Sequence, residues 1–572
     1  MAPALLPLAL SAALSWLDPA TVQPGQKGIC VTEWTGGERR EIPVVVMGVL
    51  DASGPDRKGV LVRLEDERLA GTGVVAGMSG SPVYLDGKLL GALALGWAWA
   101  REPLGIVTPF ATMHDISLAG PAATTQGPTL AQLASIAAGT TDPWALLPQL
   151  PSRRDLPPQL LAVSGLSVPT GFAADLLTRI GLQPVPAGTA HDLAGVPAPG
   201  DMMAVQLVWG DASLAAGGTV TASEGDLVWA FGHPLYGLGE VKLPVARARV
   251  LAIQGSYQSP FKVFAVGEPF GTLVADRSAG VVAKVGAAPD GTSMTVRVRD
   301  VIGDKTWRFA IAEMPILQPL LVTFLTNACL TARGASAGEA SVRLALTIHT
   351  GDGREIAVHQ ALRGPDALAR LSLFAGTVVS FLANSPFPHP ALSGVELILD
   401  RDEEPRGASI LEAVPARTTV RPGDELTVDV RLQQQERPVE HRLVTIRVPA
   451  GASAGPLELI VADGESWSDY RLRAEAIVPA DYSDQIDQLR RLGSSTDLVA
   501  ALEARERGAA LPGVSQPGLP PSWSITLASG LGSRALTRLA TVVLATERVA
   551  GSYPLEGSVR VQLTVRPGPE VP

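Results

Sequence analysis

The sequence predicts a mainly β protein with two β-barrel units, a C-terminal β-sandwich region and few helices. Short apolar runs alternate with polar residues over 41–115, and Gly, Asp and Pro separate them at short intervals. The same pattern returns over 202–300 and again over 401–480. No motif repeats at a fixed period, which excludes a solenoid.

The composition is that of a folded chain with several domains. The chain has 572 residues, which predicts about three or four domains at roughly 100–200 residues each. Hydrophobic residues make up 46% and charged residues 18%, so the chain can build a core and does not have a disordered composition. The net charge is -10 and no basic tract is present, which argues against a nucleic-acid partner.

The two cysteines and the histidines show no spacing typical of a metal site, and we expect neither a metal nor another cofactor. Cys30 and Cys329 lie far apart in the sequence. We expect two buried thiols, although a disulfide would form if the fold brought them together.

The first twenty residues, "MAPALLPLALSAALSWLDPA", contain an apolar run over 4–14. This run fits a secretory signal better than a membrane span, which needs ~20 apolar residues. We therefore expect residues 1–20 to be a signal peptide, and the protein to be exported to the periplasm or surface of a bacterium. A buried first strand or helix is the alternative. The later apolar segment 315–332 contains Gln, Asn and Thr, which favours a core helix.

Residues 21–118 predict the first barrel half, with strands such as "EIPVVVMGVLD", "GVLVRLED" and "KLLGALALGW". Asp86 and Gly87 stand between two apolar runs, which is a strong signal for a tight hairpin. The same half contains "GMSGSP", in which Ser79 lies between small residues.

The remaining chain divides into four predicted parts. Residues 119–200 are rich in Ala, Pro and Gly and predict a linker with helices at "LAQLASIAAG" and "GFAADLLTRIGL". Residues 201–300 predict the second barrel half, and 301–400 a mixed β/α region. Residues 401–572 predict an immunoglobulin-like β-sandwich, for which "PGDELTVDVRL" is typical. Its helical insert is expected at 483–509 as an amphipathic helical pair.

The "GMSGSP" turn has the residue types that serine nucleophiles require. A serine hydroxyl needs a base within reach and donors for the oxyanion. The amides of Gly77 and Ser79 would be those donors, and Gly80 would leave room for the substrate. A hydrolase elbow G-x-S-x-G would place Gly where Ser81 stands and would continue into a helix, whereas Pro82 and a hairpin follow here. A purely structural turn between two strands is the other interpretation.

His233 is the candidate general base because it ends an apolar strand in "LVWAFGHPLYGLG" and follows a glycine in a tight turn. Asp66 in "VRLEDERLAG" and Asp276 in "GTLVADRSAG" compete to orient its imidazole. Either aspartate could instead be a turn residue or the partner of Arg68 or Arg277. The other histidines are interpreted as ordinary surface or core residues: His114, His191, His349, His359, His389 and His441.

Several of these motifs resemble known peptidases. "GMSGSP" followed by a β-hairpin has the layout of the G-D-S-G-G-P motif of chymotrypsin-like peptidases. More closely, "GTGVVAGMSGSPVYLDGKLLGAL" resembles the nucleophile region of the stage IV sporulation protein B (SpoIVB) serine peptidases, with Ser79 as nucleophile. "DERL" at Asp66 and "AFGHP" at His233 are similar to the Asp and His motifs of that family, and 259–273 is similar to a stretch that follows its His. The similarity of "DERL" slightly favours Asp66 over Asp276 as the aspartate that orients the imidazole of His233.

The resemblance implies two chymotrypsin-like barrels and a serine endopeptidase that uses Ser-His-Asp acyl-enzyme catalysis on a narrow set of proteins, itself included. The apolar "ALALGWAWA" favours a hydrophobic residue in the substrate. In the sporulation enzymes the His segment precedes the Ser segment, whereas here it follows. The C-terminal β region has no counterpart there, and we expect it to recruit a substrate or a cell-envelope protein. The alternative function is an inactive peptidase fold that serves as an envelope binding or scaffold module, which the permuted order favours.

Overall fold

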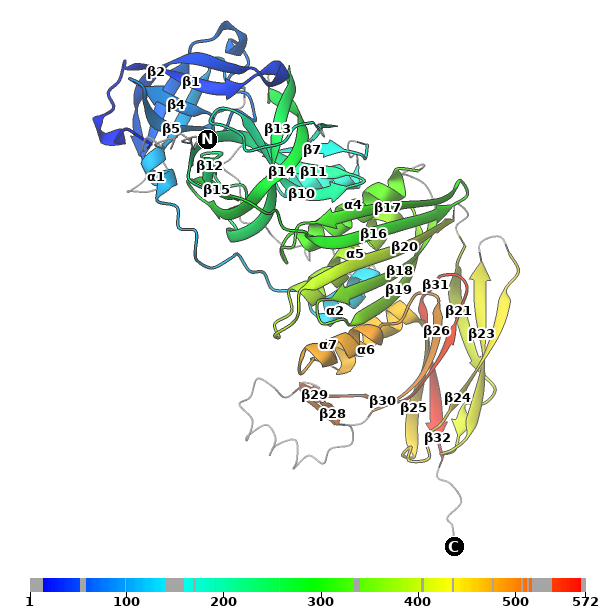
Figure 1. Ribbon diagram of the computed structural model, residues 1–572. Helices are drawn as coiled ribbons and strands as arrows, with labels where there is room; N and C mark the ends of the chain where they lie inside the picture. Colours follow the sequence, from blue (N-terminus) through cyan, green and yellow to red (C-terminus); the bar gives the residue numbers. More distant parts are fainter. Residues whose placement is uncertain are drawn as a thin grey trace, which may run out of the picture. The chain divides into compact units, whose positions relative to one another are not determined.

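The computed structural model is mainly β, with 51% of its described residues in strands and 17% in helices, as the sequence predicts. It falls into two compact units (Figure 1). Unit 1 comprises Met1–Ala123, Gln149–Gly291 and Ala310–Met314, and unit 2 comprises Thr124–Pro148, Thr292–Phe309 and Pro315–Pro572. The structure describes residues 14–51, 58–97, 99–138, 159–167, 171–190, 192–256, 258–333, 340–402, 406–434, 437–475, 478–505, 508–511, 514–516 and 537–566.

The first part of unit 1 is a closed barrel with the strand order β1-β2-β3-β6-β5-β4. Its strands are β1 (Lys27–Glu33), β2 (Arg39–Asp51), β3 (Lys58–Leu64), β4 (Pro82–Leu85), β5 (Lys88–Leu95) and β6 (Leu104–Pro109). β1 pairs with both β2 and β4, which closes the ring. Asp86 and Gly87 connect β4 to β5 with φ values of 50° and 76°, so the predicted tight hairpin is confirmed.

The second part of unit 1 is also a closed ring of strands. It contains β10 (Met202–Gly210), β11 (Ser213–Glu224), β12 (Leu227–Ala230), β13 (Gly239–Gln254), β14 (Phe261–Arg277) and β15 (Gly280–Val285). They follow the order β10-β13-β14-β15-β12-β11, and β11 pairs back with β10. The two curled, mainly β parts are consistent with the predicted chymotrypsin-like fold.

Shorter elements complete unit 1. β7 (Gln159–Ser164) pairs with β11, β8 (Leu182–Pro186) runs parallel to β7, and β9 (Gly188–Thr189) pairs with β14. The helices are α1 (Phe110–His114) and α3 (Phe172–Arg179), and the short 3-10 turns are η1 (Pro19–Thr21), η2 (Thr35–Gly37) and η3 (Glu67–Leu69). α3 falls in the second helical stretch predicted for the linker.

The described chain begins with a segment that lies on the first barrel. The amide of Leu17 donates to the carbonyl of Leu89 at 2.9 Å, and Trp16 forms a bridge with the same residue. Most of the predicted signal peptide, residues 1–13, lies outside the described residues. Among the described helices, none is long and apolar enough to cross a membrane.

Unit 2 begins with a sheet of strand order β19-β18-β20-β16-β17 that two long helices accompany (Figure 1). The strands are β16 (Thr292–Asp300), β17 (Gly303–Ile311), β18 (Ala340–Thr350), β19 (Glu355–Gly364) and β20 (Leu392–Asp402). The two long helices are α4 (Gln318–Thr331) and α5 (Ala367–Ala383), and the shorter α2 (Leu130–Ala137) also belongs to this part. α4 is almost entirely buried, which confirms the core helix predicted at 315–332, and α2 confirms the first predicted linker helix.

The rest of unit 2 contains two sheets that share one apolar core. One sheet has the order β24-β23-β21-β31 and the other β22-β32-β25-β26-β30. The strands are β21 (Ala408–Pro415), β22 (Thr419–Val420), β23 (Glu425–Gln434), β24 (Glu440–Arg447), β25 (Gly455–Asp463), β26 (Asp497–Ala504), β30 (Val542–Ala550), β31 (Leu555–Glu556) and β32 (Ser558–Val565). A small third sheet contains β27 (Gly508–Leu511), β28 (Val514–Gln516) and β29 (Thr537–Leu539).

The helical pair predicted at 483–509 is wrong in its second half. The structure has α6 (Gly464–Glu475) and α7 (Tyr482–Arg490), and then the strand β26. Leu498, Ala500 and Leu502 face the core between the two sheets, whereas Val499 and Ala501 pack with Trp467 of α6 on the other side. A strand that is buried on both faces shows no alternation, so its sequence resembles a helix.

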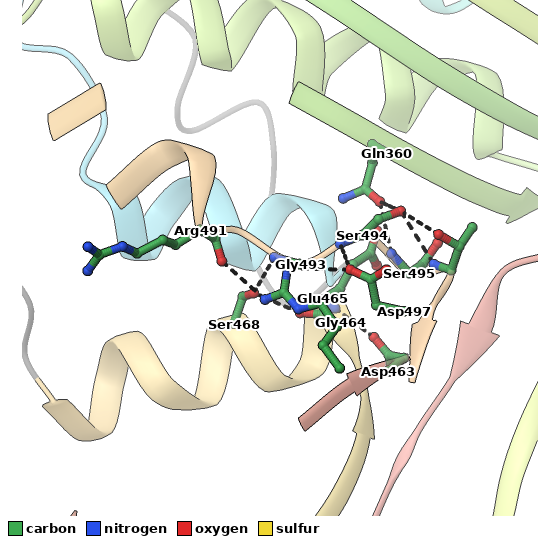
Figure 2. Close-up of polar contacts among 12 residues, drawn as sticks. Gln360, Asp463, Gly464, Glu465, Ser468, Arg491, Gly493, Ser494, Ser495 and Asp497 are labelled. Carbon is green, nitrogen blue, oxygen red and sulfur yellow. Dashed lines mark hydrogen bonds and ion pairs between the residues drawn. The ribbon is translucent and has the colours of Figure 1, made fainter. Parts of the chain in front are cut away.

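Polar contacts redirect the chain between α7 and β26 (Figure 2). The amide of Gly493 donates to the Ser468 hydroxyl at 2.8 Å, and the amide of Ser495 donates to Oε1 of Gln360 at 3.1 Å. At the start of α6, both Glu465 and Ser466 donate their amides to the Asp463 carboxylate. These contacts satisfy backbone groups that the end of α7 and the start of α6 leave open.

Both cysteines are buried thiols outside any disulfide, Cys30 in unit 1 and Cys329 in unit 2. The expectation of two buried thiols is therefore confirmed, and no disulfide joins them.

Candidate active site

Ser79 lies in a tight turn that leads into β4, and we call residues 76–81 the nucleophile turn. Gly77 and Gly80 adopt φ values of 94° and 95°, in the left-handed region that favours glycine. Gly80 also has no room for a side chain, because a Cβ there would lie 1.8 Å from the carbonyl oxygen of Thr219. Ser79 itself is half-buried, while both glycines are buried. The turn is therefore rigidly placed and keeps its serine partly accessible.

The second barrel holds the carbonyl groups of the nucleophile turn. On β11, the Thr219 hydroxyl donates to the carbonyl of Gly77 at 2.9 Å, and the Thr219 amide donates to the carbonyl of Ser79 at 2.8 Å. The Thr221 hydroxyl donates to the carbonyl of Gly80 at 2.7 Å. Thr219 and Thr221 are both fully buried, so water does not compete for these bonds.

The two amides proposed for the oxyanion hole are the ones left open. Within the described part of the chain, neither the Gly77 amide nor the Ser79 amide has an internal acceptor. The carbonyl of Ala76 accepts from the amide of Lys262 at 3.0 Å, and the carbonyl of Met78 accepts from the amide of Ser81 at 2.9 Å. In a trans peptide the N–H points opposite to the C=O, so these bonds direct the Gly77 amide away from Lys262 and the Ser79 amide away from Ser81.

His233 follows two residues with left-handed backbone, Phe231 and Gly232, both with φ of 70°. Phe231 is one of three non-glycine residues with positive φ among those that the structure describes, and this conformation costs energy. The imidazole is buried, with 5% exposure, and its Nδ1 lies 2.8 Å from the carbonyl oxygen of Pro234. A carbonyl can only accept, so Nδ1 carries the proton and Nε2 is the basic nitrogen.

The structure brings the nucleophile turn and the His233 turn together. Thr219 donates its amide to Ser79 and accepts at its carbonyl from the amide of Phe231 at 3.3 Å. Both turns also contact β5, where Leu93 exchanges backbone hydrogen bonds with Gly80 and Ser81. A Cβ on Gly232 would lie 2.7 Å from the Cβ of Ala92, the residue before Leu93. Two segments that are far apart in sequence thus meet on neighbouring residues of one strand.

Asp276 contacts the loop that follows His233. Its carboxylate accepts from the amides of Leu235 at 2.7 Å, Tyr236 at 2.8 Å and Leu238 at 3.1 Å. Burial raises the pKa of Asp276, and these backbone donors act in the opposite direction. This arrangement fixes the loop, and through it the carbonyl of Pro234 that orients the imidazole.

Asp66 is the N-cap of η3, ahead of the nucleophile turn. Its Oδ1 accepts from the amide of Arg68 at 2.9 Å and lies 3.8 Å from Nε of the same residue. Its described contacts are those of a turn residue and a partner of Arg68, the alternative that the sequence left open.

Sequence reasoning missed Thr219, Thr221 and Lys262. The two threonines stand at alternate positions of the apolar strand "GGTVTASEG", and Lys262 interrupts the apolar run "FKVFAV". A polar residue at a position that the strand period assigns to the interior is the signal that could have identified them.

The fold and the two adjoining turns are those of a mainly β protein consistent with a chymotrypsin-like architecture, with a serine and a histidine on adjacent segments. Residues 13–96 match the family model of the SpoIVB peptidase S55. This match confirms the predicted SpoIVB-type assignment for the N-terminal segment, which includes Gly77, Ser79 and Asp66 but not His233. No curated protein and no solved structure matches the chain. Among the described residues, no group of three or more His, Cys, Asp or Glu side chains could hold a metal ion.

Proposed function

We propose that this protein is a serine endopeptidase that acts through an acyl-enzyme. The family match of residues 13–96 supports a peptidase function. The pair of open amides at Gly77 and Ser79 is the observation that supports the acyl-enzyme mechanism. The amides of the neighbouring residues all donate to carbonyls: Ala76, Met78, Gly80 and Ser81. Alternate open amides beside a serine are the arrangement that an oxyanion requires.

In the proposed reaction, Ser79 Oγ attacks the carbonyl carbon of the scissile peptide bond and its proton passes to Nε2 of His233. The negative charge that forms on the carbonyl oxygen is accepted by the amides of Gly77 and Ser79. Collapse of this intermediate breaks the C–N bond, and the imidazolium returns the proton to the leaving amine. Water then hydrolyses the acyl ester by the same proton path. Asp276 positions the loop beside His233 and Asp66 caps a turn, so neither aspartate needs to bind the imidazole in this scheme.

The proposal also includes a protein or peptide substrate from a narrow set, with a hydrophobic residue near the cleaved bond. We also propose that the protein is exported to the bacterial envelope and that residues 401–572 recruit a protein partner. The signal-like composition of residues 1–20 and the separate core of the C-terminal sandwich support them.

Fluorophosphonate labelling tests the proposal, because the probe phosphonylates only an activated serine and releases fluoride. Wild type is expected to be labelled, and Ser79→Ala to lose labelling completely. His233→Ala is expected to be labelled at least about 100-fold more slowly, because general base catalysis contributes roughly 10²–10⁴-fold. Folding of each variant is checked by circular dichroism.

Ser117→Ala and His114→Ala are the matched controls, since both residues lie in unit 1 outside the site. They are expected to be labelled at the wild-type rate. A folded wild type that resists labelling would reject the peptidase proposal and favour the alternative, a peptidase fold that has kept only a binding or scaffold role.

A further inference from the structure

Lys262 is a fully buried lysine near the start of β14, with 0% exposure. Its Nζ donates to the Thr32 hydroxyl on β1 at 2.9 Å. Thr32 belongs to the first barrel and Lys262 to the second, so this side chain crosses from one barrel into the other. Burying an ammonium group is costly, and a charge in such a place calls for an explanation.

Lys262 touches the beginning of the nucleophile turn. Its amide donates to the carbonyl of Ala76 at 3.0 Å, the bond that directs the Gly77 amide away from the Lys262 backbone. Its methylene stem packs against Gly77, where an added Cβ would lie 3.1 Å from Cδ of the lysine. The backbone of residue 262 therefore holds Ala76, and the lysine side chain itself contributes the packing of its stem against Gly77, the first oxyanion donor.

The ammonium group of Lys262 also reaches the end of the same turn. The Ser81 hydroxyl donates to Oγ1 of Thr32 at 2.8 Å, so Thr32 accepts from Ser81 and from Lys262 together. All three side chains are fully buried. In a water-free setting such a shared acceptor fixes its donors tightly.

Burial brings the pKa of Lys262 close to neutral pH, so the protonation of this side chain varies there. Burial lowers its pKa to about 8, while the charge of Glu33 on β1 acts in the opposite direction and raises it. Burial raises the pKa of Cys30 to about 12, so this thiol stays protonated. Glu33 accepts from the amides of Met202 at 2.8 Å and Val250 at 2.7 Å in the second barrel. Its carboxylate is thereby held in place, and its charge acts on the lysine from across the barrel boundary.

We propose that Lys262 is a positioning residue of the oxyanion hole, whose ammonium group, acting through Thr32 and Ser81, keeps the nucleophile turn in its reactive conformation. The proposal rests on the peptidase function proposed above. It adds that reactivity at Ser79 is lost when the buried ammonium loses its proton.

The test compares wild type with Lys262→Met, which keeps the length of the stem and removes the charge and the hydrogen bond. Labelling by a fluorophosphonate is followed from pH 6 to 10. We expect Lys262→Met to be labelled at least about 10-fold more slowly at pH 7, since loss of one oxyanion donor costs roughly 10²–10³-fold. Lys284→Met, an exposed lysine on the neighbouring strand β15, is the matched control and is expected to behave as wild type.

The pH profile separates positioning from simple packing. The wild-type rate is expected to fall above about pH 8, where the ammonium is lost, and this alkaline fall is expected to be absent in Lys262→Met. If Lys262→Met labels at the wild-type rate, or labels slowly but keeps the alkaline fall, the proposal is overturned. Thr32→Val, which removes the shared acceptor and keeps the charge, is expected to be slow and to lack the alkaline fall; it carries the test if Lys262→Met does not fold.

Hydrogen exchange of residues 74–83 makes the test independent of activity. If Lys262 positions the turn, exchange in this peptide is faster in Lys262→Met than in wild type at the same pH. Wild type that is never labelled would reject the peptidase function, and the exchange comparison would still decide the role of Lys262. Equal exchange in the two proteins would overturn that role.

Discussion

Thr219 shows how much of this candidate site depends on a residue with no chemical part in the proposed reaction. Its amide, carbonyl and hydroxyl each make one bond, to Ser79, Phe231 and Gly77. One fully buried threonine thus fixes the distance between the nucleophile turn and the turn that carries His233. The candidate serine and histidine are placed by backbone bonds, which leave less freedom than contacts between side chains.

The two candidate aspartates can be separated by an isosteric change. Asp276→Asn replaces one acceptor oxygen by an NH₂ group that faces backbone donors, so at least one of the bonds from Leu235, Tyr236 and Leu238 is lost. We expect a loss of about 1–3 kcal/mol in the free energy of unfolding. We also expect slower fluorophosphonate labelling, because the His233 loop is loosened. Urea unfolding and labelling rates measure the two effects.

Asp66→Asn is the matched change on the other candidate. An asparagine caps a helical turn about as well as an aspartate, because its side-chain oxygen still accepts from the amide of Arg68. Stability and labelling are expected to stay near wild type. If Asp66→Asn abolished labelling and Asp276→Asn did not, the aspartate roles assigned here would be reversed.

At the scale of the element, the nucleophile turn is a loop whose shape requires glycine. Gly80→Ala would place a Cβ 1.8 Å from the Thr219 oxygen and 2.6 Å from the Phe231 amide nitrogen, at a φ of 95°. Both contacts are to backbone, which moves only if the barrels separate locally. We expect unit 1 to lose about 3 kcal/mol of stability and labelling to be lost, as measured by urea unfolding and by probe incorporation.

Gly87→Ala tests whether the positive φ alone explains that cost. Gly87 has a φ of 76°, but nothing lies within 4 Å of a Cβ placed there. Only backbone strain of about 1 kcal/mol is expected, with labelling unchanged. Similar losses in the two variants would mean that the close approach to β11 has no energetic role.

Local sequence signals predicted those elements whose conformation depends mainly on their own residues. The hairpin at Asp86 and Gly87 needs only a two-residue turn with positive φ, and it forms as predicted. Alternation likewise predicted strands of the first barrel such as β2 and β3, whose buried residues lie mainly on one face. It failed for 497–504, because β26 is covered on both faces and its period disappears.

The site was predictable only where its motifs are local. "GMSGSP" and "AFGHP" point to Ser79 and His233 as candidates because glycine-rich turns are visible in the sequence. Thr219 and Lys262 act through contacts across 142 residues to Gly77 and 230 residues to Thr32, respectively. Such pairings follow from how two barrels dock, which no short stretch of sequence encodes.

At the scale of the whole chain, the order of the two barrel halves matters less than the contacts between them. Glu33 of the first barrel enters the second, where two amides hold it, and Lys262 of the second enters the first. Arg39 on β2 donates through Nη2 to Oδ2 of Asp201, just ahead of β10, at 3.1 Å. These reciprocal contacts specify one docking geometry whichever half comes first in the sequence.

The buried ammonium group of Lys262 predicts that the free energy of unfolding and the reactivity of Ser79 respond to alkaline pH in opposite directions. The pKa of Lys262 is lowered from its ordinary value of 10.5 to about 8 by burial. Between these two values the unfolded chain binds a proton that the folded chain has released, so this residue makes the folded state more stable as pH rises. Reactivity is expected to fall over the same range, because the ammonium that positions the nucleophile turn is lost.

The difference in unfolding free energy between wild type and Lys262→Met isolates this contribution. Buried acids such as Cys30, whose pKa is raised from 9.0 to about 12, act in the opposite sense above pH 9, but they are present in both proteins and largely cancel. We expect the difference to move in favour of wild type by about 1.4 kcal/mol per pH unit above pH 8. Urea unfolding at intervals from pH 7 to 10 measures it. A flat difference would show that Lys262 does not release its proton on folding, and the alkaline fall in labelling would then need another cause.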